Sequence, residues 1–135
     1  MRRHQGWAKA LTERGLFSPE LAAIQQGPSS VRVGGQLFLD VLTRVPDLEA
    51  VFCCNDDLAL GALFECQRQG IRVPQEMAIM GFNDLEYCAS TFPSLSSVTT
   101  PRTEMARRAA TIILDILRGS GERPAARLVM QLTAP

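Results

Sequence analysis

Three consecutive polar residues, Asn55, Asp56 and Asp57, separate two apolar runs in the stretch VFCCNDDLALGAL. Two adjacent carboxylates could hold a metal ion, and a neighbouring amide could bind a ligand. Asn and Asp are also good helix caps, and acidic residues in a first turn favour the positive end of the helix dipole. The sequence favours capping for Asp56 and Asp57, with a metal-dependent active site as the alternative.

Other catalytic or metal-binding patterns are absent from the sequence. It contains no phosphate-binding Gly loop ending in Gly-Lys-Ser/Thr and no Gly-x-Ser-x-Gly elbow. The single histidine, His4, offers no partner for a triad. The four cysteines, Cys53, Cys54, Cys66 and Cys88, form no Cys-x-x-Cys pair, so we interpret them as reduced thiols of a cytoplasmic protein. We therefore expect no catalysis, metal or cofactor.

The composition is that of one soluble domain. The 135 residues are 46% hydrophobic and 21% charged, which is ordinary for a globular protein. Lys plus Arg and Asp plus Glu both number 14, so this chain alone lacks the positive charge expected of a nucleic-acid binder. No apolar run approaches the roughly 20 residues of a membrane span, and the N-terminus has no apolar core of a secretory signal.

Hydrophobic patterning predicts alternating helices and strands, hence an α/β fold with an open parallel-sheet sandwich. The continuous apolar centres of strands 48–54 and 77–82 predict cover on both faces. We expect Thr103 to cap the last helix. The broad apolar arc of that helix has few elements left to cover it, so the chain resembles part of a larger assembly. The expected strands are 21–27, 48–54, 77–82 and 126–132, and residues 95–101 are expected to form a strand or an extended linker. The expected helices are 2–15, 56–70, 103–118 and a segment that follows the loop 28–30 and ends before Pro46.

Polar residues follow three of these strands. Ser29, Asn55 and Asn83 each come just after a strand, and ligands of parallel α/β sheets bind beyond the carboxyl ends of strands. Amides and hydroxyls both donate and accept hydrogen bonds. If the three strands are neighbours, this rim suits a polyhydroxylated ligand.

Four segments, RRHQGWAKAL, AVFCCNDDLALGAL, QGIRVPQEMAIMGFND and FPSLSSVTTP, closely resemble the LacI/GalR family of transcriptional regulators. The resemblance covers nearly the whole chain and is strongest to the gluconate-operon repressors. It implies a periplasmic-binding-protein-like fold and effector sensing by a repressor, without catalysis. Operator DNA would be bound only through a DNA-binding domain missing from this chain.

The resemblance also implies a domain organisation. Residues 1–95 would form the C-terminal lobe of the effector-binding domain. Residues 96–119 would contain a crossover and a helix of the N-terminal lobe, and residues 120–135 would return as a strand to the C-terminal lobe. The uncovered last helix would then belong to a lobe that this chain largely lacks.

Carried over position by position, the resemblance makes Arg3, Ser29, Asn55 and Asn83 ligand contacts. Asn83 stands where many family members have an aspartate, and Ser29 stands where several have a large aromatic residue. Losing a negative charge while keeping Arg3 favours an anionic ligand, since a guanidinium pairs well with a carboxylate. We therefore expect a sugar acid such as gluconate, or otherwise a sugar, as the effector.

The helix after Asn55 carries a second apolar surface. Leu60 and Phe64 lie on a flank of this helix, and the resemblance places the helix at a homodimer interface, with Thr91 near its edge. A different reading is that Phe64 only widens the core. The competing functions are a periplasmic-type sugar-binding protein and, less favoured, a metal-dependent enzyme that uses Asp56 and Asp57.

Overall fold

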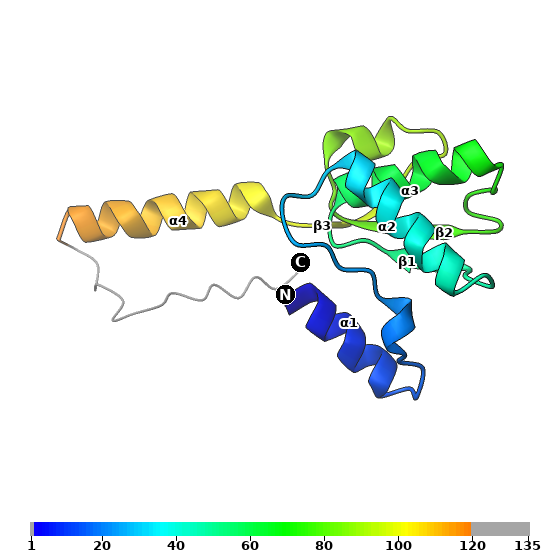
Figure 1. Cartoon of the computed structure of the whole chain (residues 1–135). Coiled ribbons are helices and arrows are strands. Elements are labelled where there is room, and N and C mark those ends of the chain that lie inside the picture. Colours follow the sequence, from blue (N-terminus) through cyan, green and yellow to red (C-terminus); the bar gives the residue numbers. More distant parts are fainter. Residues whose placement is uncertain (1, 120–135) are drawn as a thin grey trace. The chain divides into compact units, whose positions relative to one another are not determined.

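The structure is a computed structural model, and it describes residues 2–119. The chain divides into two compact units, Met1–Thr100 and Pro101–Pro135. The expected strand 126–132 lies outside the described residues. In chain order the elements are α1 (Arg2–Thr12), η1 (Pro19–Leu21), α2 (Val31–Arg44), β1 (Ala50–Phe52), α3 (Asp56–Gln69), β2 (Ala78–Asn83), η2 (Glu86–Ala89), β3 (Ser96–Thr99) and α4 (Arg102–Leu117) (Figure 1).

The first unit contains a parallel sheet in the order β1-β2-β3. Ala50 of β1 pairs with Ala78 of β2, and Asn83 of β2 pairs with Thr99 of β3. Parallel strands joined through a helix confirm the predicted open α/β class. All three strands point their carboxyl ends the same way, so the residues that follow β1 and β2 meet at one edge.

Helices α2 and α3 lie side by side against the sheet (Figure 1). Each begins at a side-chain cap: Ser30 accepts from the Val33 N–H at 3.2 Å, and Asn55 accepts from the Leu58 N–H at 3.0 Å. Gly70 ends α3 in a left-handed conformation with φ of 72°. Glycine adopts that conformation without steric cost, which explains why the helix stops there.

Two glycines bring the backbones of α2 and α3 into direct contact. A Cβ atom on Gly34 would lie 2.3 Å from the Leu58 carbonyl oxygen, and one on Gly61 would lie 2.0 Å from the Val31 carbonyl oxygen. Both gaps are far below van der Waals contact. The helix pair therefore requires glycine at these two positions.

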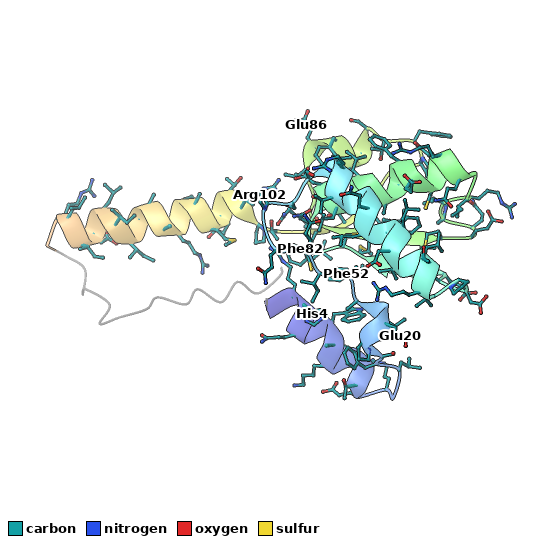
Figure 2. The ribbon with its side chains drawn as sticks, viewed as in Figure 1. His4, Glu20, Phe52, Phe82, Glu86 and Arg102 are labelled. Atoms are coloured by element: carbon teal, nitrogen blue, oxygen red, sulfur yellow. The ribbon has the colours of Figure 1, made fainter. Side chains whose placement is uncertain are left out.

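The core lies between this helix pair and one face of the sheet. Its buried side chains come from both helices and the strands, with Phe38, Leu63 and Ile79 among the larger ones. On the opposite face, Phe52 and Met80 remain 38% and 40% exposed. The prediction of strands covered on both faces is thus wrong for the described residues, because the helix pair packs on one face only. Figure 2 shows Phe52 on the side of the sheet that faces α1.

Two local predictions are corrected. Residues 21–27 form no strand; η1 takes the first of them and Ala22 is extended, but the segment pairs with no strand among the described residues. An extended backbone counts as a strand only when a neighbour accepts its hydrogen bonds. The expected cap Thr103 lies inside α4, whose N-cap position is Pro101 and has no side-chain hydrogen bond.

The first compact unit runs to Thr100. Residues 96–99 form β3 and pair with β2, and the second unit begins at Pro101. Helix α4 of the second unit has no buried residue, and Ile113 and Leu117 are 57% and 77% exposed. None of the described helices is long and apolar enough to cross a membrane.

Candidate functional site

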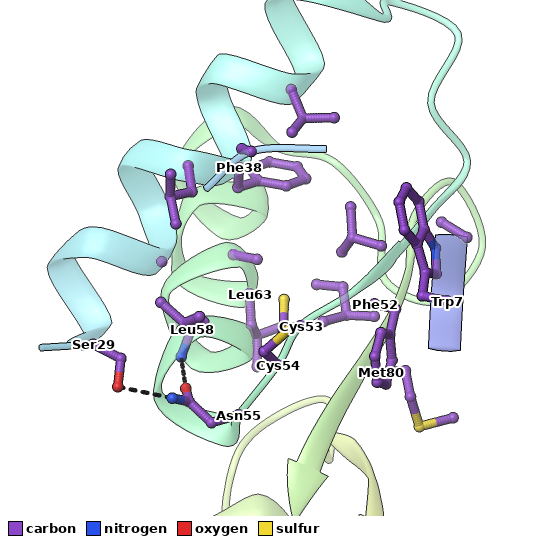
Figure 3. Close-up of a pocket in the computed structure, with 18 of the residues that line it drawn as sticks. Trp7, Ser29, Phe38, Phe52, Cys53, Cys54, Asn55, Leu58, Leu63 and Met80 are labelled. Atoms are coloured by element: carbon purple, nitrogen blue, oxygen red, sulfur yellow. Dashed lines mark hydrogen bonds between the residues drawn. The ribbon is translucent and has the colours of Figure 1, made fainter. Parts of the chain in front are cut away.

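A groove of about 1060 Å³ runs along the outer edge of β1. Apolar side chains of α1, α2 and β1 make most of its walls, with Trp7, Phe38 and Phe52 among them (Figure 3). One end is polar and contains Arg3, Ser29 and Asn55. An apolar cleft with a few convergent polar groups is the usual form of a small-molecule site.

Ser29 and Asn55 are joined at this polar end. The Asn55 side-chain amide donates to the Ser29 hydroxyl at 2.7 Å, while its oxygen accepts from the Leu58 N–H (Figure 3). Ser30 takes the capping role in α2, which leaves Ser29 available to Asn55. The start of α3 therefore fixes the orientation of the Asn55 amide, with the Ser29 hydroxyl beside it.

Arg3 reaches the same strand ends from α1. Its guanidinium donates to the Cys54 carbonyl at 2.8 Å and stacks over the Phe82 ring, 4.1 Å from the ring centroid. Cys54 precedes Asn55, and Phe82 precedes Asn83. These two contacts place a positive charge between the ends of β1 and β2, and stacking on an aromatic ring is a favourable setting for a guanidinium.

Asn83 lies at the end of β2, one residue beyond Phe82. It does not line the groove, so the structure brings three of the four expected ligand contacts together and leaves Asn83 beside them. Asn83 and Asp84 have φ of 116° and 57°. Consecutive non-glycine residues in this region cost about 1–3 kcal/mol each and persist where surrounding contacts fix them.

The carboxylates of Asp56 and Asp57 hold the loop after β2. Asp56 is fully buried and accepts from the Leu85 N–H at 2.9 Å and from the Ser97 hydroxyl at 2.5 Å. Asp57 accepts from the Tyr87 hydroxyl at 2.8 Å. Both residues lie in the first turn of α3, but the predicted side-chain capping by them is wrong, because Asn55 is the cap.

Asp56 and Asp57 are also the candidates for a metal-dependent active site. Each carboxylate already accepts hydrogen bonds from the protein. Within residues 2–119, no group of three or more His, Cys, Asp or Glu side chains is placed to hold a metal ion.

The four cysteine thiols are free; Cys66 and Cys88 are buried, and Cys53 and Cys54 are half-buried. Burial, and then the neighbouring Cys54, raises the pKa of Cys53 to about 12, and burial followed by the nearby Glu65 raises the pKa of Cys66 to about 11. Burial is also the main reason that the pKa of Cys88 is raised. A thiol with a raised pKa is a poor nucleophile at neutral pH.

The proposed dimer residues lie on and beside α3. Phe64 is 42% exposed, whereas Leu60 is half-buried and packs against the core. The Thr91 hydroxyl donates to the Cys88 carbonyl at 3.1 Å. The Gln67 side chain donates to the Phe92 carbonyl at 2.7 Å, which fixes the loop carrying Phe92, itself 91% exposed.

Sequence reasoning missed Phe82, Ser97 and Phe92. Phe82 was assigned to a buried strand, and its contact with Arg3 joins residues far apart in the chain. The sequence FPSLSSVTT gives a signal for the other two: an aromatic residue before proline is a turn that can expose the ring, and alternate hydroxyls on a strand share one face.

Comparison with known proteins adds to this geometry. The family model described as a periplasmic binding protein-like domain matches residues 1–134. The HTH-type transcriptional regulator GntR of Pseudomonas aeruginosa is 44% identical over 124 residues, which are 92% of this chain and 36% of the relative. The chain thus spans little more than a third of the length of this curated relative.

Solved structures of transcriptional regulators have the same fold as this chain. The transcription regulator GntR from Chromobacterium violaceum has a TM-score of 0.86 and 40% identity, covering 93% of this chain and 46% of that chain. A complex of the transcriptional regulator CelR with cellobiose has a TM-score of 0.80 and 30% identity, and the match covers 90% of this chain and 37% of that chain. The chain belongs to the periplasmic-binding-protein-like domain family, among the effector domains of LacI/GalR-type transcriptional regulators.

Proposed function

We infer that this chain supplies one wall of an effector site that binds a sugar acid and, through it, controls a transcriptional repressor. The observation that carries the proposal is that the hydrogen-bonded pair Ser29–Asn55 and the Arg3 guanidinium, which bonds to the Cys54 carbonyl, all line one apolar groove. The amide and the hydroxyl suit ligand hydroxyl groups. The relative CelR is described in complex with cellobiose, which supports a carbohydrate ligand.

The positive charge of Arg3 favours a sugar acid over a neutral sugar as the ligand. Its guanidinium uses one nitrogen on the Cys54 carbonyl, and no carboxylate forms a salt bridge with it among the described residues. A ligand carboxylate would supply the missing negative charge. Hydrogen bonds between charged partners are roughly twice as strong as neutral ones.

A thermal-shift comparison tests this ligand class. In a protein of the relatives' length that carries this chain, gluconate should raise the melting temperature and glucose should not. A ligand at 100 times its Kd stabilises by about 2.7 kcal/mol, which is readily seen in such a measurement. EDTA should leave the shift unchanged.

Arg3 variants provide the specificity control. Arg3→Gln should abolish most of the gluconate shift, because the charged partner is lost. Arg14→Gln should keep the shift, because it changes an arginine in the turn just after α1 whose guanidinium donates to the Ala10 carbonyl. Equal loss in both variants, or metal-dependent turnover of a phosphoester, would refute the proposal. For the 135-residue chain alone we expect weak binding, and micromolar affinity would contradict the idea that it supplies one wall only.

The exposed surface around Phe64 and Phe92 is proposed as a homodimer contact. Phe64→Lys should shift sedimentation from dimer toward monomer, since a desolvated lysine charge is costly in an apolar contact. Leu16→Lys is the matched control, because Leu16 is 62% exposed and lies after α1. Unchanged sedimentation of Phe64→Lys would remove α3 from the interface.

The remaining parts of the proposal follow from kinship with regulators. A protein of the relatives' length that carries this chain would work in the cytoplasm without catalysis and would contact operator DNA through a separate DNA-binding domain. We further propose that residues 1–95 act within the C-terminal lobe and that residues 96–119 lead into the N-terminal lobe. Residues 120–135 would return to the C-terminal lobe.

A further inference from the structure

The left-handed turn at Asn83 and Asp84 is held from two sides. On one side, the Ser97 hydroxyl of β3 accepts from the Asp84 N–H at 3.0 Å and donates to buried Asp56 at 2.5 Å. On the other side, Asp56 accepts from the Leu85 N–H at 2.9 Å. A single carboxylate and a single hydroxyl thus fix two successive amides of the turn.

Thr99 adds a third contact. Its hydroxyl donates to the Asp84 carboxylate at 2.8 Å, and the ladder sets Thr99 directly beside Asn83. Ser97 and Thr99 are two residues apart on one strand, so their side chains leave the same face of β3. Together they keep the backbone of residues 83–84 in a conformation that non-glycine residues rarely adopt.

We propose that Ser97 and Thr99 are positioning residues for the effector site: they hold the Asn83–Asp84 turn in its left-handed form and so fix the direction of Asn83 beside the polar end of the groove. This inference rests on the proposed function for its ligand, and on the hydrogen bonds above for its geometry. Asp56 is the buried anchor that orients the Ser97 hydroxyl.

The position of β3 in the chain gives the contacts of Ser97 and Thr99 a second consequence. Only Thr100 separates β3 from Pro101, where the second unit begins. A change in the path of the chain at this link would pull first on Thr99 and Ser97, and through them on the turn. Because coupling between binding and conformation is reciprocal, a ligand at the polar end of the groove would in turn bias the link.

Hydrogen exchange of the 135-residue chain tests the geometry. In Ser97→Ala, the Asp84 amide should exchange at least about tenfold faster, because its acceptor has been removed. Amides in the core of α3 should change little, because their own backbone hydrogen bonds remain. Ser97→Thr keeps the hydroxyl and should restore protection. Ser96→Ala, at the exposed neighbouring position, is the matched control. Unchanged Asp84 exchange in Ser97→Ala overturns the inference.

Titration with gluconate tests the consequence for binding, in a protein of the relatives' length that carries this chain. Ser97→Ala and Thr99→Val should weaken gluconate binding about tenfold or more, with Ser97→Thr close to the unchanged protein. Equal affinity in Ser97→Ala and the unchanged protein overturns the positioning role. If the unchanged protein does not bind gluconate, the proposed ligand is wrong, and the exchange experiment alone decides whether Ser97 holds the turn.

Discussion

Replacing Gly61 with alanine is expected to lower the free energy of unfolding by about 3 kcal/mol or more. The added Cβ would lie 2.0 Å from the Val31 carbonyl oxygen and 2.5 Å from the Gly35 nitrogen, both backbone atoms that cannot rotate away. Helices α2 and α3 would have to separate, which opens the core around Phe38 and Leu63. The gain in helix propensity from Gly to Ala, roughly 1 kcal/mol, is too small to offset this.

Urea denaturation followed by circular dichroism measures the effect. Gly6→Ala is the matched control, because it makes the same substitution within a helix, α1, and its new Cβ would meet nothing within 4 Å beyond the adjacent residues and backbone of that helix. It should be neutral or slightly stabilising. A Gly61→Ala variant as stable as Gly6→Ala would show that the two helices do not pack through this glycine.

Replacing Asp56 with alanine is expected to cost about 3–5 kcal/mol of stability. The change leaves the Leu85 N–H and the Ser97 hydroxyl without their acceptor in a buried place. The Asp56 carboxylate fits here because residue 81 is glycine: a Cβ on Gly81 would lie 2.3 Å from a carboxylate oxygen of Asp56. Each bond to a charged group is worth roughly 1.5–3 kcal/mol, and two are lost together.

Asp57→Ala is the control for this second prediction. It removes the neighbouring carboxylate, which accepts a hydrogen bond from the Tyr87 hydroxyl. It should cost about 1–2 kcal/mol, clearly less than Asp56→Ala. The same denaturation experiment compares the two. If Asp57→Ala is the more damaging change, Asp56 does not anchor the loop after β2.

Asp56 also shows what can and cannot be predicted from the sequence. Periodicity located α2, α3 and all three described strands, and strand ends placed Asn55 and Asn83 on one edge. The role of Asp56 was not predictable in this way, because its partners Leu85 and Ser97 lie 29 and 41 residues further along the chain. A local pattern of acids before an apolar run looks the same whether the carboxylate caps a helix or anchors a loop.

Gly61 and the segment 21–27 illustrate the same limit. Glycine within a helix signals a close approach only when the neighbouring backbone is known. The apolar run LAAIQ has strand propensity, but the strand needs a partner, and the groove lies between this segment and β1. Packing between distant elements decided both cases.

The resemblance to a known family contributed what patterns alone could not. It selected Arg3, an exposed arginine on a short helix, as a ligand contact. The structure then placed that arginine against Cys54 and Phe82, the residues that precede Asn55 and Asn83. Whether these groups bind the effector is the central claim of the proposed function.

Calorimetric titration of gluconate into a protein of the relatives' length that carries this chain tests that claim most directly. We expect saturable binding that Asn55→Ala weakens at least about tenfold, because the amide at the polar end of the groove is removed; a tenfold change corresponds to about 1.4 kcal/mol. Gln69→Ala, which removes an exposed amide at the far end of α3, should bind as the unchanged protein does. Equal affinities for Asn55→Ala and Gln69→Ala would show that the strand-end rim is not the effector site.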